Sequence, residues 1–250
     1  MTKLYANIGV GHENQWEVMR TRLVSAAQCN ADAVILTKST PIEIIPDHKK
    51  YVSIKSRWGN KSYLEVANNS EISIDNCAKL YELAEHIGIP IIWSVTDTNA
   101  AEWVKDNTPC SQIKIHFDSS NNWDLINYCK NSFAEIMYCY TGKHVEQLLA
   151  FYKSKRELAT VSLYHTVAKF PAKVEEINLQ KINQIKKHLY VNIGYEGRCP
   201  DIFPDCAVLF KDIDYIEKYL GDDDSEGAIL SPQKFYDFFV NMNQLEVANG

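Results

Sequence analysis

The chain has 250 residues, with 26 lysines and arginines against 32 aspartates and glutamates, which gives a net charge of −6. Hydrophobic residues make up 46% and charged residues 23%, and this balance excludes a disordered or collagen-like chain. The acidic charge argues against binding to nucleic acid or anionic lipid through bulk electrostatics. We therefore expect no nucleic-acid partner.

No apolar run approaches the roughly 18 residues that a membrane-spanning helix needs. The first residues lack the basic stretch and apolar core of a signal peptide. The seven cysteines are odd in number and show no CxxC or CxxH spacing, so we expect free thiols in a reducing compartment rather than disulfides or a zinc finger. Together these features predict a cytoplasmic protein without a membrane partner.

Short apolar strands alternate with amphipathic helices from the start of the chain. Residues 4–10 are β-prone, and a helical spacing of apolar residues follows them. The continuous apolar run at residues 31–36 is typical of a strand buried on both faces. Residues 39–72 are irregular or hairpin-like, and Ser73 is a plausible N-cap for the helix after them.

The same alternation continues to the end of the chain. The predicted strands are residues 88–95, 111–117, 133–140, 158–165, 189–194 and 213–220, and the helices lie near residues 100–105, 123–129, 144–153, 179–187 and 231–243. Residues 206–210 are an alternative place for the last strand.

Eight strands with helices between most of them predict one α/β domain over residues 1–250 with a parallel sheet. This number of units fits a (β/α)8 TIM barrel. A doubly wound open sheet is the alternative, since its pattern of strands is much the same. Against it, the first strand–helix turn reads GVGHENQ and lacks the GxGxxG dinucleotide fingerprint.

In a TIM barrel the active site lies at the carboxyl ends of the strands. Polar residues at these ends are the site candidates by position: Asn7, His12, Asp97, Lys114, Thr141, Gly142, His165, Glu196, Arg198 and Glu217. Lys114 is the most informative, because a lysine that points into a barrel is costly unless an anion pairs with it. We expect it to bind an anion; the alternative is that it points outward and reaches solvent between helices.

Eight short segments, in the same order, resemble the sialic acid synthase (N-acetylneuraminate synthase) family. They are ANIGVGH (6–12), ADAV (31–34), HIGI (86–89) followed by Asp97, IKI (113–115), YTG (140–142), LYH (163–165), IEK (216–218) and LSP (230–232). The resemblance covers nearly the whole chain and implies a TIM barrel. It also implies condensation of phosphoenolpyruvate with an N-acetylated hexose such as N-acetylmannosamine.

In that family a divalent metal, typically manganese, polarises the sugar aldehyde, and two histidines hold it. The resemblance places the first of them at His165, whereas Arg198 replaces the second. An arginine stays protonated and cannot bind a metal, so the metal site is incomplete. The resemblance further implies His12 and Glu217 as catalytic residues, and Lys114, Thr141, Gly142, Arg198 and Asp97 as ligand- or anion-binding residues.

Other departures from the family bear on the reaction. The glutamate of the first strand is Asn7, the lysine of the second strand is Ile35, and the histidine after the last strand is Tyr219. The family's C-terminal antifreeze-like domain has no counterpart in the sequence. Asn7, Glu196 and His165 could form a rebuilt site, but nothing in the sequence selects it.

We therefore expect a divergent barrel tied to acidic (nonulosonic) sugar or surface polysaccharide biosynthesis, without the full manganese-dependent condensation. It would bind a sugar or a phosphoenolpyruvate-like ligand, or partner a complete synthase as a protein subunit. The alternatives are an active synthase that condenses phosphoenolpyruvate with an N-acetylhexosamine-type sugar, and an unrelated TIM-barrel enzyme. Whether the protein is an enzyme stays open at this point.

Overall fold

Eight parallel strands close into a barrel in the computed structural model, which describes residues 1–9, 11–140, 160–188, 191–222 and 227–249. Around the barrel the strands are β1 (Lys3–Asn7), β2 (Ala33–Lys38), β5 (Ile91–Val95), β6 (Gln112–Ile115), β7 (Glu135–Tyr140), β8 (Thr160–His165), β9 (Asn192–Gly197) and β10 (Tyr215–Leu220). Strand β10 pairs back onto β1, with Asn7 opposite Tyr219. The predicted TIM barrel is confirmed, and the doubly wound open sheet is wrong.

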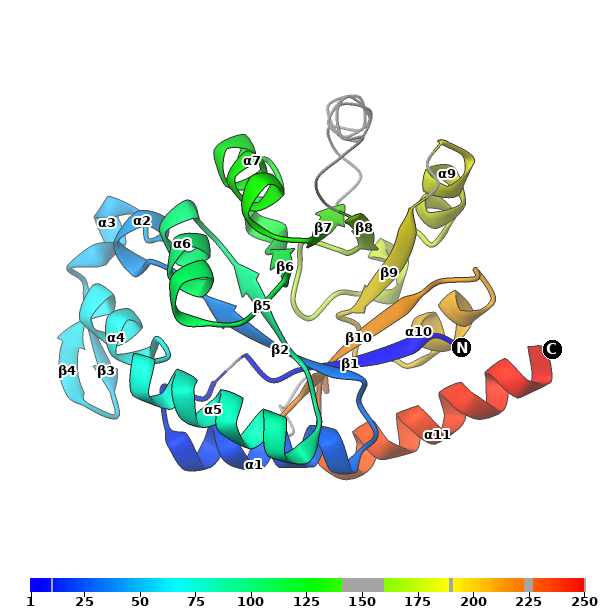
Figure 1. The fold of residues 1–250 in the computed structure, drawn as a ribbon, viewed down its shortest axis with the longest axis horizontal. Coiled ribbons are helices and arrows are strands. Elements are labelled where there is room, and N and C mark those ends of the chain that lie inside the picture. Colours follow the sequence, from blue (N-terminus) through cyan, green and yellow to red (C-terminus); the bar gives the residue numbers. More distant parts are fainter. Residues whose placement is uncertain (10, 141–159, 189–190, 223–226, 250) are drawn as a thin grey trace.

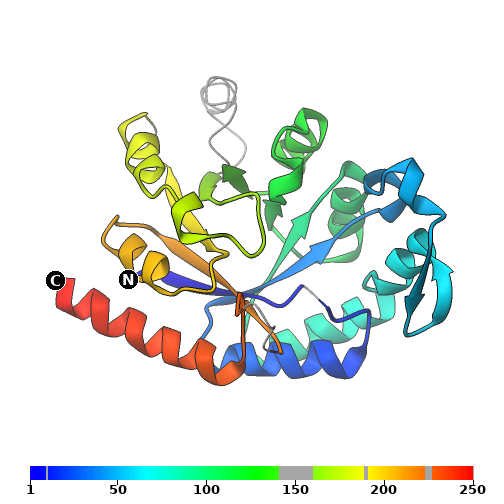
Figure 2. The same cartoon turned by 180° about the vertical axis from the view of Figure 1, so that it is seen from behind.

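Helices surround this ring of strands (Figures 1 and 2). They are α1 (Trp16–Gln28), α5 (Ile74–Ile87), α6 (Thr98–Asn107), α7 (Trp123–Ser132), α9 (Gln180–His188), α10 (Phe203–Leu209) and α11 (Pro232–Asn249). A short ninth strand, β11 (Ile229–Leu230), pairs parallel to β10. The first and last described residues lie at the same end of the barrel, as both views show. Among the described residues, no helix combines the length and apolar character that crossing a membrane requires.

The segment between β2 and α5 leaves the barrel wall and lies beside the barrel (Figure 1). It contains α2 (Pro41–Ile44), α3 (Asp47–Lys50), the antiparallel hairpin of β3 (Ser53–Ser56) and β4 (Gly59–Ser62), and α4 (Tyr63–Ser70). The hairpin-like character of this segment is confirmed, whereas the three short helices were not expected. Two further 3-10 turns, η1 (Phe117–Ser119) and η2 (Val174–Glu176), follow β6 and β8.

Local sequence signals set the ends of α5. The Ser73 side chain accepts a hydrogen bond from the Asn76 backbone N–H, so the predicted N-cap is confirmed. Gly88 ends the helix with φ at +75°, a left-handed conformation that glycine adopts without steric cost. The apolar residues Cys77, Leu80 and Ala84 are buried on one face of the helix.

Alternate residues of each strand face opposite sides of the barrel wall. One set packs outward against the helices and forms the larger hydrophobic core. The other set fills the interior, where the apolar side chains are Tyr5, Ala33, Ile35, Ile92, Met137, Cys139, Tyr164 and Tyr215. These residues fill the barrel towards the amino ends of the strands, so the interior is a packed core rather than a pore.

Two strand positions differ from the expectation. Strand β9 lies three residues further along the chain than the predicted strand at residues 189–194, and residues 206–210 belong largely to helix α10. The alternative last strand is therefore wrong, and β10 lies within the predicted range 213–220. The helix expected at residues 144–153 lies outside the described residues.

Candidate functional site

A group of charged and polar side chains occupies the barrel interior towards the carboxyl ends of the strands. Lys114 points inward from β6, Glu196 from β9 and Glu217 from β10, and all three are buried. The register explains how they meet, because Glu217 lies directly opposite Glu196 in the pairing of β10 with β9. The predicted inward orientation of Lys114 is confirmed, and the outward alternative is wrong.

Lys114 makes the shortest ion pair of this group. Its Nζ lies 2.8 Å from Oε1 and 2.6 Å from Oε2 of Glu217, and 3.2 Å from Oε2 of Glu196. The Asn7 side-chain amide donates a hydrogen bond of 2.8 Å to Glu217 Oε1. Lys114 and Glu217 thus join strands β6 and β10 across the interior, and Asn7 adds β1.

Arg198, directly after β9, completes the group. Its Nε donates to Glu196 Oε1 at 2.8 Å, and its Nη2 donates to the Tyr219 hydroxyl at 3.1 Å. The Tyr219 hydroxyl in turn donates to the same Glu196 oxygen at 2.8 Å. We call Asn7, Lys114, Glu196, Arg198, Glu217 and Tyr219 the barrel network. It contains two cations and two carboxylates, so with all four ionised its net charge is zero.

Charge pairing decides the protonation of Glu196 and Lys114, whereas burial raises the pKa of Glu217 above its usual range. Burial alone would raise the pKa of Glu196, but Lys114 and Arg198 outweigh it and hold that pKa below its usual range. Burial would likewise lower the pKa of Lys114, but Glu196 and Glu217 raise it well above the ordinary value. Such desolvated charges persist only because each one has an opposite partner at contact distance.

Aromatic rings separate Arg198 from solvent. The guanidinium carbon lies 3.7 Å from the ring centre of Phe117 and 5.8 Å from that of Phe170. Phe117 belongs to η1 after β6, and Phe170 lies in the segment after β8. The guanidinium also donates from Nη1 to the Val167 carbonyl at 3.2 Å. Arg198 is only 3% exposed, and no pattern in the sequence predicted this aromatic cover.

His165 lies on the opposite side of the barrel wall from the barrel network. Its neighbour Tyr164 faces the interior, and the His165 ring stacks on Tyr195 in the outward-facing core, with a distance of 6.1 Å between ring centres. Neither ring nitrogen has a hydrogen-bond partner in the described part of the chain. Burial and then the charge of Lys181 on α9 lower the pKa of His165 to about 4.

These placements do not fit the manganese site that the family resemblance implied. The interior residue of the LYH segment is Tyr164, and Arg198 already forms an ion pair with Glu196. No group of three or more histidine, cysteine, aspartate and glutamate side chains is arranged to hold a metal within the described ranges. The expected metal role of His165 therefore finds no support in its position.

The Asp97 carboxylate accepts hydrogen bonds from neighbouring groups of the chain. It is the N-cap of α6, where Oδ1 accepts from the Ala100 N–H at 2.8 Å. Its Oδ2 accepts from the Thr40 N–H at 2.8 Å and from the Thr96 hydroxyl at 2.9 Å. Both carboxylate oxygens are thus used within the fold, and the expected ligand- or anion-binding role of Asp97 stays a prediction.

His12 lies in the loop after β1 and is 5% exposed. Its Nδ1 accepts a hydrogen bond from the Asn14 N–H at 3.0 Å. Burial, followed by the charges of Arg22 and Lys38, lowers the pKa of His12 to about 4, so the imidazole is neutral at pH 7. No hydrogen bond joins it to the barrel network in the part of the chain that is described. Thr141 and Gly142, the other expected ligand contacts, lie outside the described residues.

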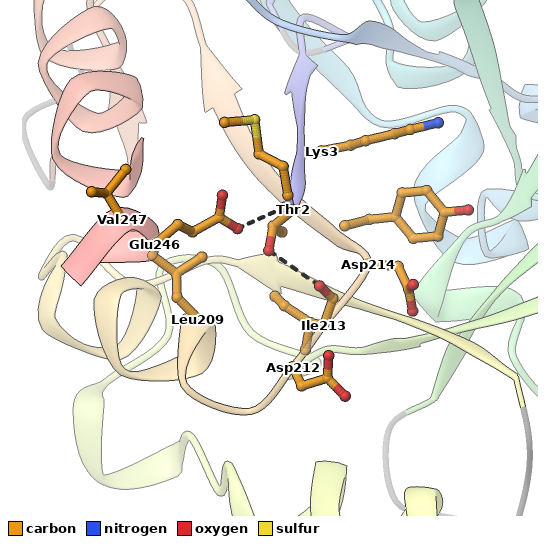
Figure 3. Close-up of a pocket in the computed structure, with 10 residues that line it drawn as sticks. Thr2, Lys3, Leu209, Asp212, Ile213, Asp214, Glu246 and Val247 are labelled. Carbon is orange, nitrogen blue, oxygen red and sulfur yellow. Dashed lines mark hydrogen bonds between the residues drawn. The ribbon is translucent and has the colours of Figure 1, made fainter. Parts of the chain in front are cut away.

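A cavity of about 750 Å³ lies at the other end of the barrel. Met1, Lys3, Asp214 and Glu246 are among its lining residues, and the Thr2 N–H donates to Glu246 Oε1 at 2.6 Å (Figure 3). Lys3 is the first residue of β1, so this cavity faces the amino ends of the strands. Active sites of TIM barrels lie at the opposite end, and we assign no catalytic role to this cavity.

Comparisons with known proteins agree with the barrel. The model of the NeuB family matches residues 23–250. The chain is 25% identical to human N-acetylneuraminate-9-phosphate synthase over 201 residues, which cover 78% of this chain and 55% of that protein. It therefore spans about half the length of this curated relative.

Two solved structures show the same fold. N-acetylneuraminic acid synthetase from Leptospira borgpetersenii, in complex with citrate, matches with a TM-score of 0.84 and 16% identity, over 100% of this chain and 85% of that one. The spore coat polysaccharide biosynthesis protein spsE from Bacillus subtilis matches with a TM-score of 0.78 and 19% identity, over 98% of this chain and 68% of that one. At these identities the likeness concerns the fold alone.

Proposed function

We propose, because this chain belongs to the NeuB family, that it is a divergent barrel tied to acidic (nonulosonic) sugar or surface polysaccharide biosynthesis. We propose further that it acts without the manganese-dependent condensation of phosphoenolpyruvate. Family membership removes the alternative of an unrelated TIM-barrel enzyme. The names of the human and Bacillus relatives support the pathway, and the barrel network supports the loss of the reaction.

The barrel network is the observation that carries this proposal. Phosphoenolpyruvate brings a phosphate and a carboxylate, and both need cations in a buried site. Here Lys114 is already paired with Glu217 at 2.6 Å, and Arg198 with Glu196 at 2.8 Å. An incoming anion would have to displace a carboxylate that cannot leave the barrel, and the displaced carboxylate would remain buried without its partner.

The remaining role is binding of a sugar-type ligand, or association with a complete synthase as a protein partner. Among the expected site residues, Lys114, Arg198 and Glu217 lie together in the barrel, whereas Asp97 caps α6 and His165 stacks on Tyr195. A cytoplasmic location, with no nucleic-acid partner, is part of the proposal.

A second candidate is an active synthase, and one observation favours it. Lys114 points into the barrel and holds a raised pKa, so a cation is present where an anionic substrate would enter. For this candidate to hold, substrate would have to compete with Glu196 and Glu217 for Lys114. We rank it below the first proposal because both carboxylates belong to adjacent, paired strands.

Calorimetric titration of phosphoenolpyruvate, with and without manganese, tests the proposal. We expect no heat of binding at millimolar ligand in either condition. We also expect no condensation product when a panel of N-acetylated hexoses is added. Micromolar binding that is lost in Lys114→Ala, together with product formation, would support the active synthase and overturn our first proposal. The thermal unfolding of the variant, recorded in parallel, shows whether it is folded.

A further inference from the structure

Glu196 is the only residue of the barrel network that contacts both cations. Its Oε1 accepts from Arg198 Nε at 2.8 Å, and its Oε2 lies 3.2 Å from Lys114 Nζ. The Tyr219 hydroxyl donates to Oε1 as a third contact. A carboxylate held between a lysine, an arginine and a hydroxyl has the surroundings of a bound carboxylate ligand.

We propose that Glu196 is a specificity-determining residue, a built-in carboxylate that occupies the place of an anionic ligand and excludes small carboxylates from the barrel. The proposal deepens the proposed function and rests on it. The Glu196 side chain closes the site, and shortening it should open a carboxylate-binding site between Lys114 and Arg198.

Glu217 does not share this role. It contacts Lys114 but not Arg198 among its described contacts, and Asn7 also binds it at 2.8 Å. When Glu196 is removed, Glu217 still neutralises Lys114, and Arg198 becomes a buried cation without a carboxylate. With all of its charged groups ionised, the barrel network then changes in net charge from zero to +1. An uncompensated buried cation favours uptake of an anion.

The aromatic cover limits the size of the anion that fits. Phe117 packs directly on the guanidinium of Arg198, at 3.7 Å from its ring centre. Phe170 is 40% exposed, and its ring centre lies 4.7 Å from that of Tyr219. Solvent therefore reaches the cover beside Phe170, and small planar carboxylates such as formate and acetate match the space that the Glu196 carboxylate vacates.

The test is chemical rescue of Glu196→Ala by formate. Thermal unfolding is measured against increasing sodium formate, with sodium chloride at the same ionic strength as the reference. We expect a saturable rise of the midpoint temperature in this variant. The apparent dissociation constant for formate should lie at least tenfold below that of the wild type. If the variant is unfolded in chloride, refolding in formate but not in chloride is the expected result.

Two controls sharpen the outcome. Glu196→Gln keeps most of the side-chain volume, so it should fold and should bind formate less tightly than Glu196→Ala. Glu17→Ala removes the carboxylate 3.1 Å from Arg20 in an exposed ion pair, where water solvates the arginine, and should show no saturable effect.

Equal formate responses of the wild type and Glu196→Ala, or failure of this variant to fold in either salt, would overturn the role of Glu196. Condensation product from the wild type would overturn the proposed function instead. The two failures are therefore distinguishable.

Discussion

At the scale of single residues, His165 shows how burial sets protonation. The side chain is 1% exposed, its ring stacks on Tyr195, and neither nitrogen has a partner in the described part of the structure. A protonated imidazole there would lose its hydration and gain no hydrogen bond, so the fold keeps His165 neutral. Because His165 is neutral in the folded protein, the free energy of unfolding depends on pH in acid.

We expect His165 to make the protein less stable as the pH falls from 7 to 5. The folded pKa of about 4 lies below the ordinary value near 6.5 of the unfolded chain, so the unfolded state binds the proton first. From these two values the loss is about 2 kcal/mol of unfolding free energy at pH 5. Urea unfolding of the wild type and His165→Leu at pH 7, 6 and 5 measures it, because the variant lacks this contribution.

The exposed His48 provides the control. His48→Leu should keep the full pH dependence of the wild type. If His165→Leu and the wild type lose the same stability between pH 7 and 5, then His165 is not held neutral in the folded protein.

His165 also shows what a short sequence motif does not predict, namely which side of the barrel wall a side chain faces. The LYH segment was correctly placed at the end of a strand, but side chains alternate across the wall, and a shift of one residue exchanges inside for outside. Tyr164 is therefore the interior residue and His165 the exterior one. Lys114, by contrast, was predictable, because a lysine within an apolar strand implies a buried partner.

At the scale of elements, most of the strands were predictable because they are short runs rich in apolar residues between helical patterns. The range predicted for β9 was three residues too early, because the inward positions of this strand carry Gly194 and Glu196 rather than apolar side chains. Gly194 is required there, since an added Cβ would lie 2.5 Å from the ring of Tyr164. Hydrophobic periodicity alone did not locate β9, and only its pairing with β10 places Glu196 opposite Glu217.

Asp97 gives the prediction that belongs to this scale. Asp97→Ala removes the N-cap of α6 and leaves the Thr40 N–H without its acceptor, so we expect a loss of about 2 kcal/mol in unfolding free energy. Asp97→Asn can still accept the hydrogen bond from Ala100 and should lose about half as much. Urea unfolding at pH 7 compares the two. Equal losses would show that the cap contributes nothing beyond the charge of Asp97.

At the scale of the whole molecule, the barrel network ties distant parts of the chain together. Lys114 and Glu217 are 103 residues apart, yet their side chains meet at 2.6 Å. Together with Asn7, Glu196 and Arg198 they connect β6, β9, β10 and β1 across the interior. The closure of β10 onto β1 therefore coincides with a set of charges that are satisfied only when the barrel is complete.

This coupling predicts a non-additive response to mutation. Lys114→Met leaves two carboxylates in a buried site without their shared cation, and we expect it to cost about 3–5 kcal/mol of unfolding free energy. Adding Glu217→Gln removes one of these carboxylates and keeps its contact with Asn7, so the double variant should be more stable than Lys114→Met alone. Urea unfolding of the wild type, both single variants and the double variant gives the coupling energy. Losses that simply add would mean that Lys114 and Glu217 act independently, and that the barrel is held closed by its hydrophobic layers alone.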